Sequence, residues 1–228
     1  MPSYSPLLAL VTGILEFFGA VFTLLSPGRK RILMPTALIF LLLAGYQFAE
    51  IAVCAAPDNL LFTRLAYLGI SALPPLGLWL MVQLISPRRG GLAVLPLVWF
   101  AAAALIVGWI FVEPACVTKS VCQVVIARYF HPPIFEVLYG LFFQAGLAVL
   151  MFGTTAGLAG AEDPVLRRHL ASLQAGLLGF VLPSLAVRIL LREPQGVLPS
   201  VQCHLALVFA VFLFILVLRE RRSARENQ

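Results

Sequence analysis

Charged residues are scarce in this sequence. Only 11% of the 228 residues are Asp, Glu, Lys or Arg, whereas 61% are apolar, and the mean hydropathy is +0.98. A soluble domain of this length needs more charge to solvate its surface, and no stretch of the chain is polar enough to form one. The composition therefore excludes a soluble protein and predicts an integral membrane protein.

The N-terminus lacks the features of a removable signal peptide. Residues 1–6 contain no Lys or Arg, and no small-residue cleavage pattern follows the first apolar run. Signal peptides carry both features. We therefore expect the first apolar run to remain in the mature protein as a membrane span.

Seven apolar runs are long enough to cross a bilayer, whose hydrocarbon layer of about 30 Å needs about 20 residues per helix. They cover residues 7–25, 32–56, 60–85, 92–112, 133–158, 165–190 and 198–218. These runs are apolar on every side, which excludes the alternating strands of a membrane β-barrel. The sequence predicts an all-α membrane protein, a seven-transmembrane-helix bundle over residues 1–222, followed by a short polar tail at 223–228.

The basic residues predict the orientation of this bundle. With the N-terminus outside and the C-terminus in the cytoplasm, eleven of the sixteen Lys and Arg residues lie on the cytoplasmic side and five outside. This is the bias that the positive-inside rule describes. The net charge of +6 then reflects topology and contact with anionic lipid. We expect a multi-pass protein of the plasma membrane, with membrane lipid and not nucleic acid as a partner.

The residue types of metal, haem and retinal sites are missing or badly placed. No CxxC or Cys/His spacing of a zinc site occurs, and neither Lys30 nor Lys119 lies in the last span, where a retinal protein needs a lysine. His131 and His204 are expected on the outer side, but His169 lies on the cytoplasmic side. A haem between His131 and His204 stays open as an alternative, although two prolines follow His131 at a loop boundary. We expect no metal, no cofactor and no catalytic residue.

All four cysteines are expected on or near the outer side, where disulfides persist. Four cysteines allow three pairings. Cys116 and Cys122 share the long loop after the fourth span, so we predict a Cys116–Cys122 disulfide that closes a small loop. A Cys54–Cys203 bond and free buried thiols are the open alternatives.

Ionisable and polar residues inside the spans indicate a ligand site. A charged group in hydrocarbon costs about 2.5–3.5 kcal/mol on insertion scales, so each needs a reason to be there. The residues that share a depth in the outer part of the membrane are Glu50, Arg64, Tyr67, Glu136, Tyr139, Arg188 and His204. We predict that they line one outward-facing pocket for a small ligand. Snorkelling to the interface and separate ion pairs between helices are the alternatives.

Two motifs predict how the spans pack. Pro74 and Pro75 remove two amide donors in the middle of the third span, which predicts a kink there. Gly153 and Gly157 form a GxxxG motif in the fifth span. We interpret this motif as a close helix contact inside the bundle.

The second and third spans resemble part of a known family. The residues concerned are the turn at Glu50, the loop Pro57-Asp58-Asn59 and the run Arg64-Leu65-x-Tyr67-Leu68-Gly69-Ile70-x-x-Leu73-Pro74-Pro75. With the basic cluster at 29–31, they resemble the seven-transmembrane N-terminal sensor region of bacterial histidine kinases over residues 10–90. No kinase or other output domain follows the last span in this chain. The resemblance implies a bacterial inner-membrane sensor that binds a small ligand and passes a helix movement to a separate cytoplasmic signalling protein.

A structural or transport subunit of a membrane complex is the alternative function. A carrier needs polar residues that continue through the inner half of the membrane, and the sequence offers few, namely Glu16, Gln83, Gln144 and Gln174. The two halves of the chain also lack the similarity that inverted repeats leave. The sequence therefore favours the sensor, and no enzyme activity is expected.

Overall fold

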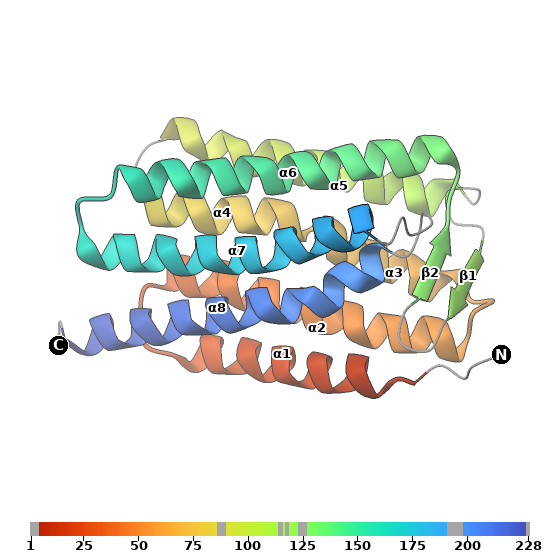
Figure 1. Cartoon of the computed structure of the whole chain (residues 1–228), viewed down its shortest axis with the longest axis horizontal. Helices are drawn as coiled ribbons and strands as arrows, with labels where there is room; N and C mark the ends of the chain where they lie inside the picture. Colours follow the sequence, from red (N-terminus) through yellow and green to blue (C-terminus); the bar gives the residue numbers. More distant parts are fainter. Residues whose placement is uncertain are drawn as a thin grey trace.

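The computed structural model describes residues 5–85, 90–113, 116, 119–122, 127–190 and 198–226. These residues form a helical bundle with one β-hairpin (Figure 1). The helices are α1 (Leu7–Leu25), α2 (Lys30–Ala55), α3 (Leu60–Ser71), α4 (Leu73–Ile85), α5 (Val94–Val112), α6 (Pro133–Ala159), α7 (Pro164–Leu190) and α8 (Leu198–Glu226). A 3₁₀ turn, η1 (Gly90–Ala93), precedes α5, and the strands are β1 (Lys119–Cys122) and β2 (Ala127–Phe130).

Six helical segments in the described part of the chain are long and apolar enough to cross a membrane. They are Leu7–Leu25, Lys30–Ala55, Leu60–Ile85, Gly91–Val112, Pro133–Ala159 and Pro164–Ala186. Large apolar side chains cover the outside of the bundle, where Leu105 is 77% exposed and Phe152 75%. Such a surface is stable in lipid and not in water. The structure thus confirms a largely helical protein, and its six long apolar segments are those that a multi-pass membrane protein requires.

The third predicted span consists of two helices, because its prolines interrupt the hydrogen-bond ladder. α3 ends at Ser71 and α4 begins at Leu73. Pro74 and Pro75 have no N–H group and cannot bond to the carbonyls one turn earlier. The Ala72 N–H bonds instead to the Gly69 carbonyl at 3.3 Å, which tightens the last turn of α3. The sequence predicted a kink at the two prolines, and the structure has a break between two helices there.

Glycines allow α6 to approach α4 closely. A Cβ atom on Gly157 would lie 2.6 Å from Ile85 Cδ1, and one on Gly153 would overlap the Met81 side chain. Gly77 of α4 makes room for Leu150 of α6 in the same way. The GxxxG motif therefore packs inside the bundle, as predicted.

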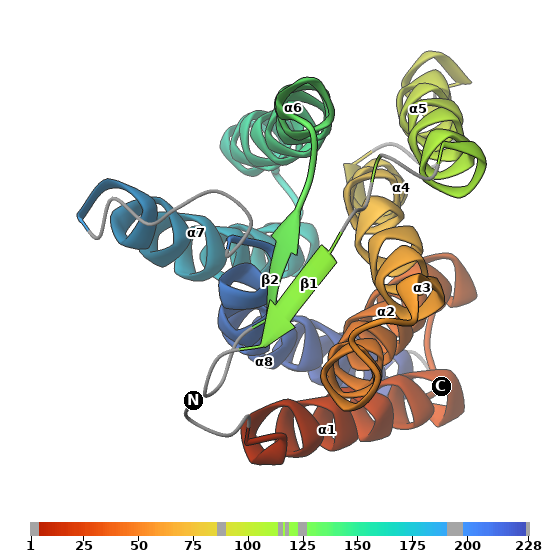
Figure 2. The ribbon, with the colours of Figure 1, turned by 90° about the vertical axis from the view of Figure 1, so that its right-hand side faces the viewer.

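The two ends of the bundle differ in character. β1 and β2 lie at one end, the hairpin end, whereas α8 terminates at the other, the C-terminal end (Figure 1). The strands are antiparallel, with Lys119 opposite Phe130 and Cys122 opposite Ala127. In the view onto the hairpin end, α1 and α8 lie near each other, and α5 is on the side away from α1 (Figure 2). The sequence did not indicate this hairpin.

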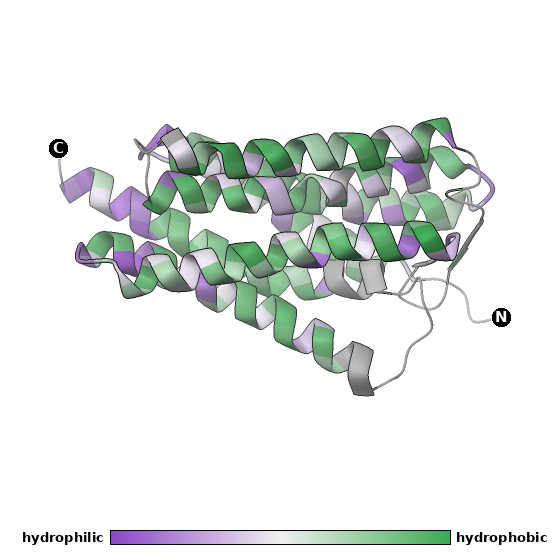
Figure 3. Ribbon diagram, turned by 90° about the horizontal axis from the view of Figure 1, so that it is seen from above, coloured by the Kyte–Doolittle hydropathy of each residue, from purple (hydrophilic) through white to green (hydrophobic). Residues whose placement is uncertain are grey.

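The last helix is longer than expected. α8 continues to Glu226, past the predicted end of the span at residue 218 and into the segment predicted as a polar tail. Hydrophilic residues gather on its last turns (Figure 3). Arg and Glu are good helix formers, and two of these residues, Arg219 and Glu220, contact other parts of the bundle.

Candidate functional site

Seven rings gather at the hairpin end, and we call them the aromatic cluster. They are Tyr46, Tyr67, Trp109, Tyr129, His131, Phe135 and Tyr139. The ring of Tyr67 is central, with its centroid 5.6 Å from Tyr129, 5.0 Å from His131 and 5.1 Å from Tyr139. Each of these contacts is edge-to-face, which is a favoured geometry for aromatic pairs. The cluster joins α2, α3, α5 and α6 to β2.

His131 links this cluster to the chain that follows α5. Its Nδ1 lies 2.9 Å from the Cys116 carbonyl oxygen, and its Nε2 lies 2.5 Å from the Tyr67 hydroxyl oxygen. Because a carbonyl only accepts, Nδ1–H donates to Cys116, and Nε2 of the neutral ring accepts the hydroxyl proton of Tyr67. Burial lowers the pKa of His131 below the usual 6.5, although the bond to Cys116 opposes this effect. The ring is therefore neutral at pH 7.

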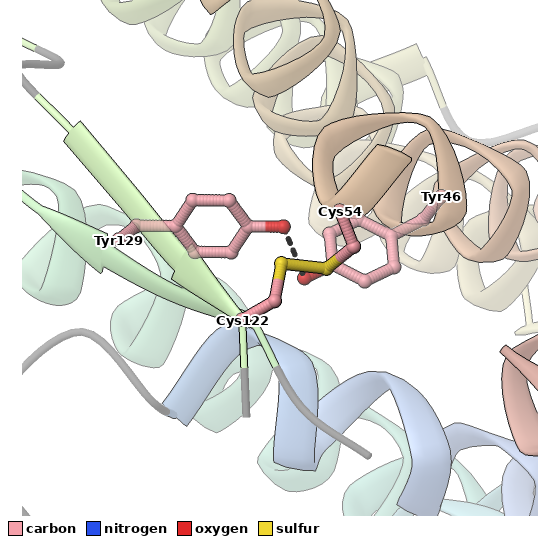
Figure 4. The surroundings of a disulfide bond; sticks show 4 residues. All are labelled: Tyr46, Cys54, Cys122 and Tyr129. Atoms are coloured by element: carbon pink, nitrogen blue, oxygen red, sulfur yellow. Dashed lines mark hydrogen bonds between the residues drawn. A yellow bond between two sulfur atoms is a disulfide. The ribbon is translucent and has the colours of Figure 1, made fainter. Parts of the chain in front are cut away.

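The predicted Cys116–Cys122 disulfide is wrong. Cys122 is bonded to Cys54, with 5.7 Å between the Cα atoms, and Cys116 is a buried free thiol (Figure 4). The hairpin carries Cys122 to the end of α2, where Cys54 lies, whereas Cys116 stays in the turn after α5. The alternative Cys54–Cys203 bond is excluded too, because Cys54 is already bonded. Burial raises the pKa of the Cys116 thiol, which keeps it unreactive.

A second contact accompanies the disulfide. The hydroxyl oxygens of Tyr46 and Tyr129 lie 3.3 Å apart, beside the sulfur atoms (Figure 4). Both side chains are buried, at 1% exposure. The disulfide and this hydrogen bond thus both attach the hairpin to α2.

The structure places the predicted ligand residues as follows. Tyr67 and Tyr139 are in direct ring contact in the aromatic cluster. Glu50 is fully buried on α2, one turn after Tyr46 on the same face. The Arg64 guanidinium lies 6.0 Å from the ring centroid of Phe111, so it is directed towards α5.

The other three predicted residues lie on α6, α7 and α8. Glu136 and His204 are half-buried near the starts of α6 and α8. The Arg188 side chain lies outside the described residues. Convergence of all seven residues on one pocket stays a prediction.

An apolar cavity lies beneath the aromatic cluster, in the middle of the bundle. It encloses about 60 Å³ and is lined by six helices. Its walls include Leu43, Pro74, Tyr139, Phe180 and Phe209, from α2, α4, α6, α7 and α8. The Tyr139 hydroxyl is the one polar side-chain group among the lining residues. Tyr139 therefore belongs to both the aromatic cluster and the cavity wall.

An ion cluster around the buried Glu220 carboxylate holds the C-terminal end together. Arg29, in the turn between α1 and α2, donates from Nη2 to Glu220 Oε2 at 2.7 Å and from Nε to Oε1 at 2.9 Å. Its backbone N–H donates to Oε1 at 2.8 Å. His169 Nε2 of α7 lies 3.4 Å from Glu220 Oε2. Burial acts to raise the pKa of Glu220, but the bonds from Arg29 outweigh it, and the pKa lies below the ordinary 4.5.

Two further features fit this cluster. Arg219 Nη1 donates to the Arg168 carbonyl and to Ser172 Oγ, both at 2.6 Å, and so attaches α8 to α7. Gly28 has φ +147°, and a Cβ atom there would lie 2.8 Å from Glu220 Cγ. Only glycine fits this turn without strain. The cluster thus joins the α1–α2 turn, α7 and α8.

Sequence reasoning missed this cluster. From the sequence, Arg29, Arg168 and Arg219 are expected on the cytoplasmic side, with Arg29 also in the basic cluster at 29–31, and no partner is predicted for any of them or for Glu220. The available signal was a single acidic residue within the basic run 219–225, because an isolated carboxylate among arginines is commonly paired.

The chain matches no protein-family model and no curated protein sequence.

Proposed function

We propose that this chain is a sensor module of the bacterial inner membrane that binds a small ligand and passes a helix movement to a separate cytoplasmic partner. It has seven spans, with α8 as the seventh, the hairpin end outside and the C-terminal end in the cytoplasm. The split of eleven to five basic residues supports this orientation. The resemblance of residues 10–90 to histidine-kinase sensor regions supports the function.

The observation that carries this proposal is the cavity beneath the aromatic cluster. A ligand there would touch α2, α3, α4, α6, α7 and α8 at once, so its arrival would change how these helices pack. The apolar walls favour a small, mainly apolar ligand, oriented by the Tyr139 hydroxyl. A dry apolar cavity of about 150 Å³ binds benzene or xenon, so the 60 Å³ seen here admits a few heavy atoms without repacking.

α7 and α8 connect the cavity to the C-terminal end, so movement at the cavity can be transmitted along them. Phe180 of α7 and Phe209 of α8 both line the cavity, and their ring centroids are 6.4 Å apart. The same two helices meet again through Arg219 and Ser172. A change in the α7–α8 contact would therefore alter the ion cluster, which a cytoplasmic partner can read. In the alternative function, a structural or transport subunit, the cavity has no such effect.

The test is to fill the cavity and measure movement at the C-terminal end. Ala206→Phe places a ring where Ala206 lines the cavity. Ala145→Phe, on the exposed face of α6, is the matched control. Two spin labels are attached to genetically encoded residues at positions 162 and 225 of the whole chain in lipid nanodiscs. Electron spin resonance then measures the distance between the two labels.

We expect Ala206→Phe to shift this distance by about 1–2 Å, the scale of helix shifts in switching proteins, and the control to leave it unchanged. Pressurised xenon should shift the wild-type distance in the same direction. If a folded Ala206→Phe protein and xenon both leave the distance unchanged, the cavity is a packing defect and the structural alternative is favoured.

A further inference from the structure

A second, larger hollow lies between α1 and α8, away from the central cavity. It has a volume of about 610 Å³, and Phe40 of α2 contributes to its lining. This volume is within the range of about 300–1,000 Å³ that is typical of small-molecule sites. Phe18 and Val211 on its rim are 64% and 52% exposed, so the groove opens sideways to the surrounding lipid. Its lining side chains are apolar except that of Glu16, whose two carboxyl oxygens are buried against the groove wall.

Glu16 has no partner within the described part of the chain. Its side chain is 1% exposed, and neither carboxyl oxygen makes a hydrogen bond or an ion pair with a described residue. It is the central residue of α1, nine residues from both Leu7 and Leu25. An ionised carboxylate at this depth is costly, and a neutral carboxyl leaves its O–H donor unmatched. One buried, unsatisfied polar group therefore belongs to a lining residue of the groove at mid-membrane depth.

The residues around Glu16 shape the groove. Gly19, one turn further along α1, makes room for the ring of Phe40, because a Cβ atom at this glycine would lie 2.8 Å from that ring. Towards the C-terminal end, the rings of Phe22 and Phe214 are 4.9 Å apart. The Arg221 guanidinium lies 5.5 Å from the Phe22 ring. These side chains close that end, so an occupant enters from the lipid side.

We propose that this groove binds an apolar, chain-shaped molecule that carries a hydrogen-bond-accepting oxygen, such as a quinone or ketone carbonyl, beside Glu16. The neutral carboxyl donates to this oxygen, and the hydrocarbon walls hold the chain. An ordinary phospholipid does not satisfy Glu16, because its ester carbonyls lie near the interface and not at the middle of the bilayer. An ammonium group fits poorly too, since a buried ion pair needs further polar groups that the lining does not supply.

The test labels Glu16 in the whole chain, reconstituted in phospholipid nanodiscs. Dicyclohexylcarbodiimide adds to protonated carboxyl groups in apolar surroundings, and mass spectrometry locates the adduct. The competing probes are decylbenzoquinone, decylbenzene and decylamine, which share one chain length. We expect Glu16 to be labelled, and decylbenzoquinone to slow the labelling about tenfold, the factor that one good hydrogen bond supplies. Decylbenzene and decylamine should have little effect.

Two tryptophan variants locate the protection. Val211→Trp fills the groove from its exposed rim and should abolish the effect of the quinone. Val11→Trp, at a position on α1 that is 47% exposed and outside the groove lining, is the matched control and should preserve it. Both positions face lipid, so both variants should fold.

Several outcomes would overturn the proposal. An unlabelled Glu16 in a folded bundle would show that the carboxyl is ionised or inaccessible. Equal protection by decylbenzene would mean an apolar groove without recognition of oxygen, and stronger protection by decylamine would mean a carboxylate site for cations. Loss of quinone protection in Val11→Trp would mean that the effect does not arise in the groove.

Discussion

The two ends of the bundle are held together by different chemistry. At the hairpin end, the Cys54–Cys122 bond and the rings around Tyr67 attach β1 and β2 to the helices. At the C-terminal end, Arg29 and Glu220 make the attachment through charge. A disulfide and packed rings persist over a wide range of salt concentration, whereas an ion pair can be exchanged for the charges of a partner. We interpret the hairpin end as the rigid frame and the C-terminal end as the part that rearranges.

The largest expected effect concerns which end faces the cytoplasm. A fluorescent reporter fused after Gln228 should be active, and the same reporter inserted at Lys119 should be inactive. Alkaline phosphatase, which needs an oxidising compartment, should give the reverse pattern at both positions and serves as the control. The opposite result would exchange the roles of the two ends.

Breaking the disulfide should have the largest effect on stability. The bond closes a loop of 68 residues, so the chain-entropy relation sets an upper limit of about 4 kcal/mol on the loss in Cys54→Ser. Thermal unfolding in detergent, with and without reductant, measures it. Cys116→Ser is the control: it keeps the Cys54–Cys122 bond and should lose stability in reductant as wild type does, whereas the unfolding temperature of Cys54→Ser should not depend on reductant. Non-reducing peptide mapping should show residues 54 and 122 linked, and a linked 116–122 peptide would contradict the structure.

The ion cluster should respond asymmetrically to mutation. Arg29→Ala leaves the buried Glu220 carboxylate without its main partner and should lower the free energy of unfolding by about 2–3 kcal/mol. This is less than the loss for a fully buried pair, because the Arg29 side chain is 44% exposed. Glu220→Gln leaves Arg29 without its partner, but Arg29 can reach water, so the free energy of unfolding should fall by only about 1–2 kcal/mol. The exposed neighbour Arg31→Ala should lie within about 0.5 kcal/mol of wild type. Equal losses in all three variants would show that the cluster adds nothing specific.

Within the aromatic cluster, two hydroxyl deletions should differ. Tyr67→Phe keeps the ring contacts but leaves His131 Nε2 without its donor, and should cost about 1–2 kcal/mol. Tyr46→Phe removes the longer contact of 3.3 Å to Tyr129, and should lower the free energy of unfolding by about 0.5 kcal/mol. Thermal unfolding under identical conditions compares them. A larger loss in Tyr46→Phe would place the centre of the cluster at the hairpin contact instead.

Acid should loosen the hairpin end first. The pKa of His131 is lowered from 6.5, so its contribution to stability is present above pH 6.5 and is lost as the pH falls through its folded pKa. The pKa of Glu220 is lowered from 4.5, so its contribution persists until the pH falls below 4.5. Hydrogen exchange at pH 5 and pH 7, corrected for intrinsic rates, should show faster exchange around residues 127–135 only. At the C-terminal end, hydrogen exchange is measured in the His169→Gln variant, because His169 also titrates beside Glu220. At the hairpin end, His131→Gln should remove the difference in exchange between pH 5 and pH 7.

Local features of this protein followed from the sequence because their causes are local. A helical span depends on its own length and hydrocarbon content, so the six confirmed segments lie close to their predicted bounds. Pro74 and Pro75 interrupt a helix through their own missing donors. The Gly153–Gly157 motif was assigned correctly because small residues on one helix face allow close packing.

Only the tertiary structure decided which distant groups meet. The disulfide depends on where the hairpin lies relative to α2, and sequence proximity favoured Cys116 over Cys54 as the partner of Cys122. The same holds for Glu220, whose partner Arg29 is 191 residues away. A span can be predicted from composition alone, because it needs only enough apolar residues to be buried in hydrocarbon. Side-chain pairing depends on how each helix is rotated and how deep it lies in the membrane. The apolar faces of these helices determine neither the rotation nor the depth by themselves.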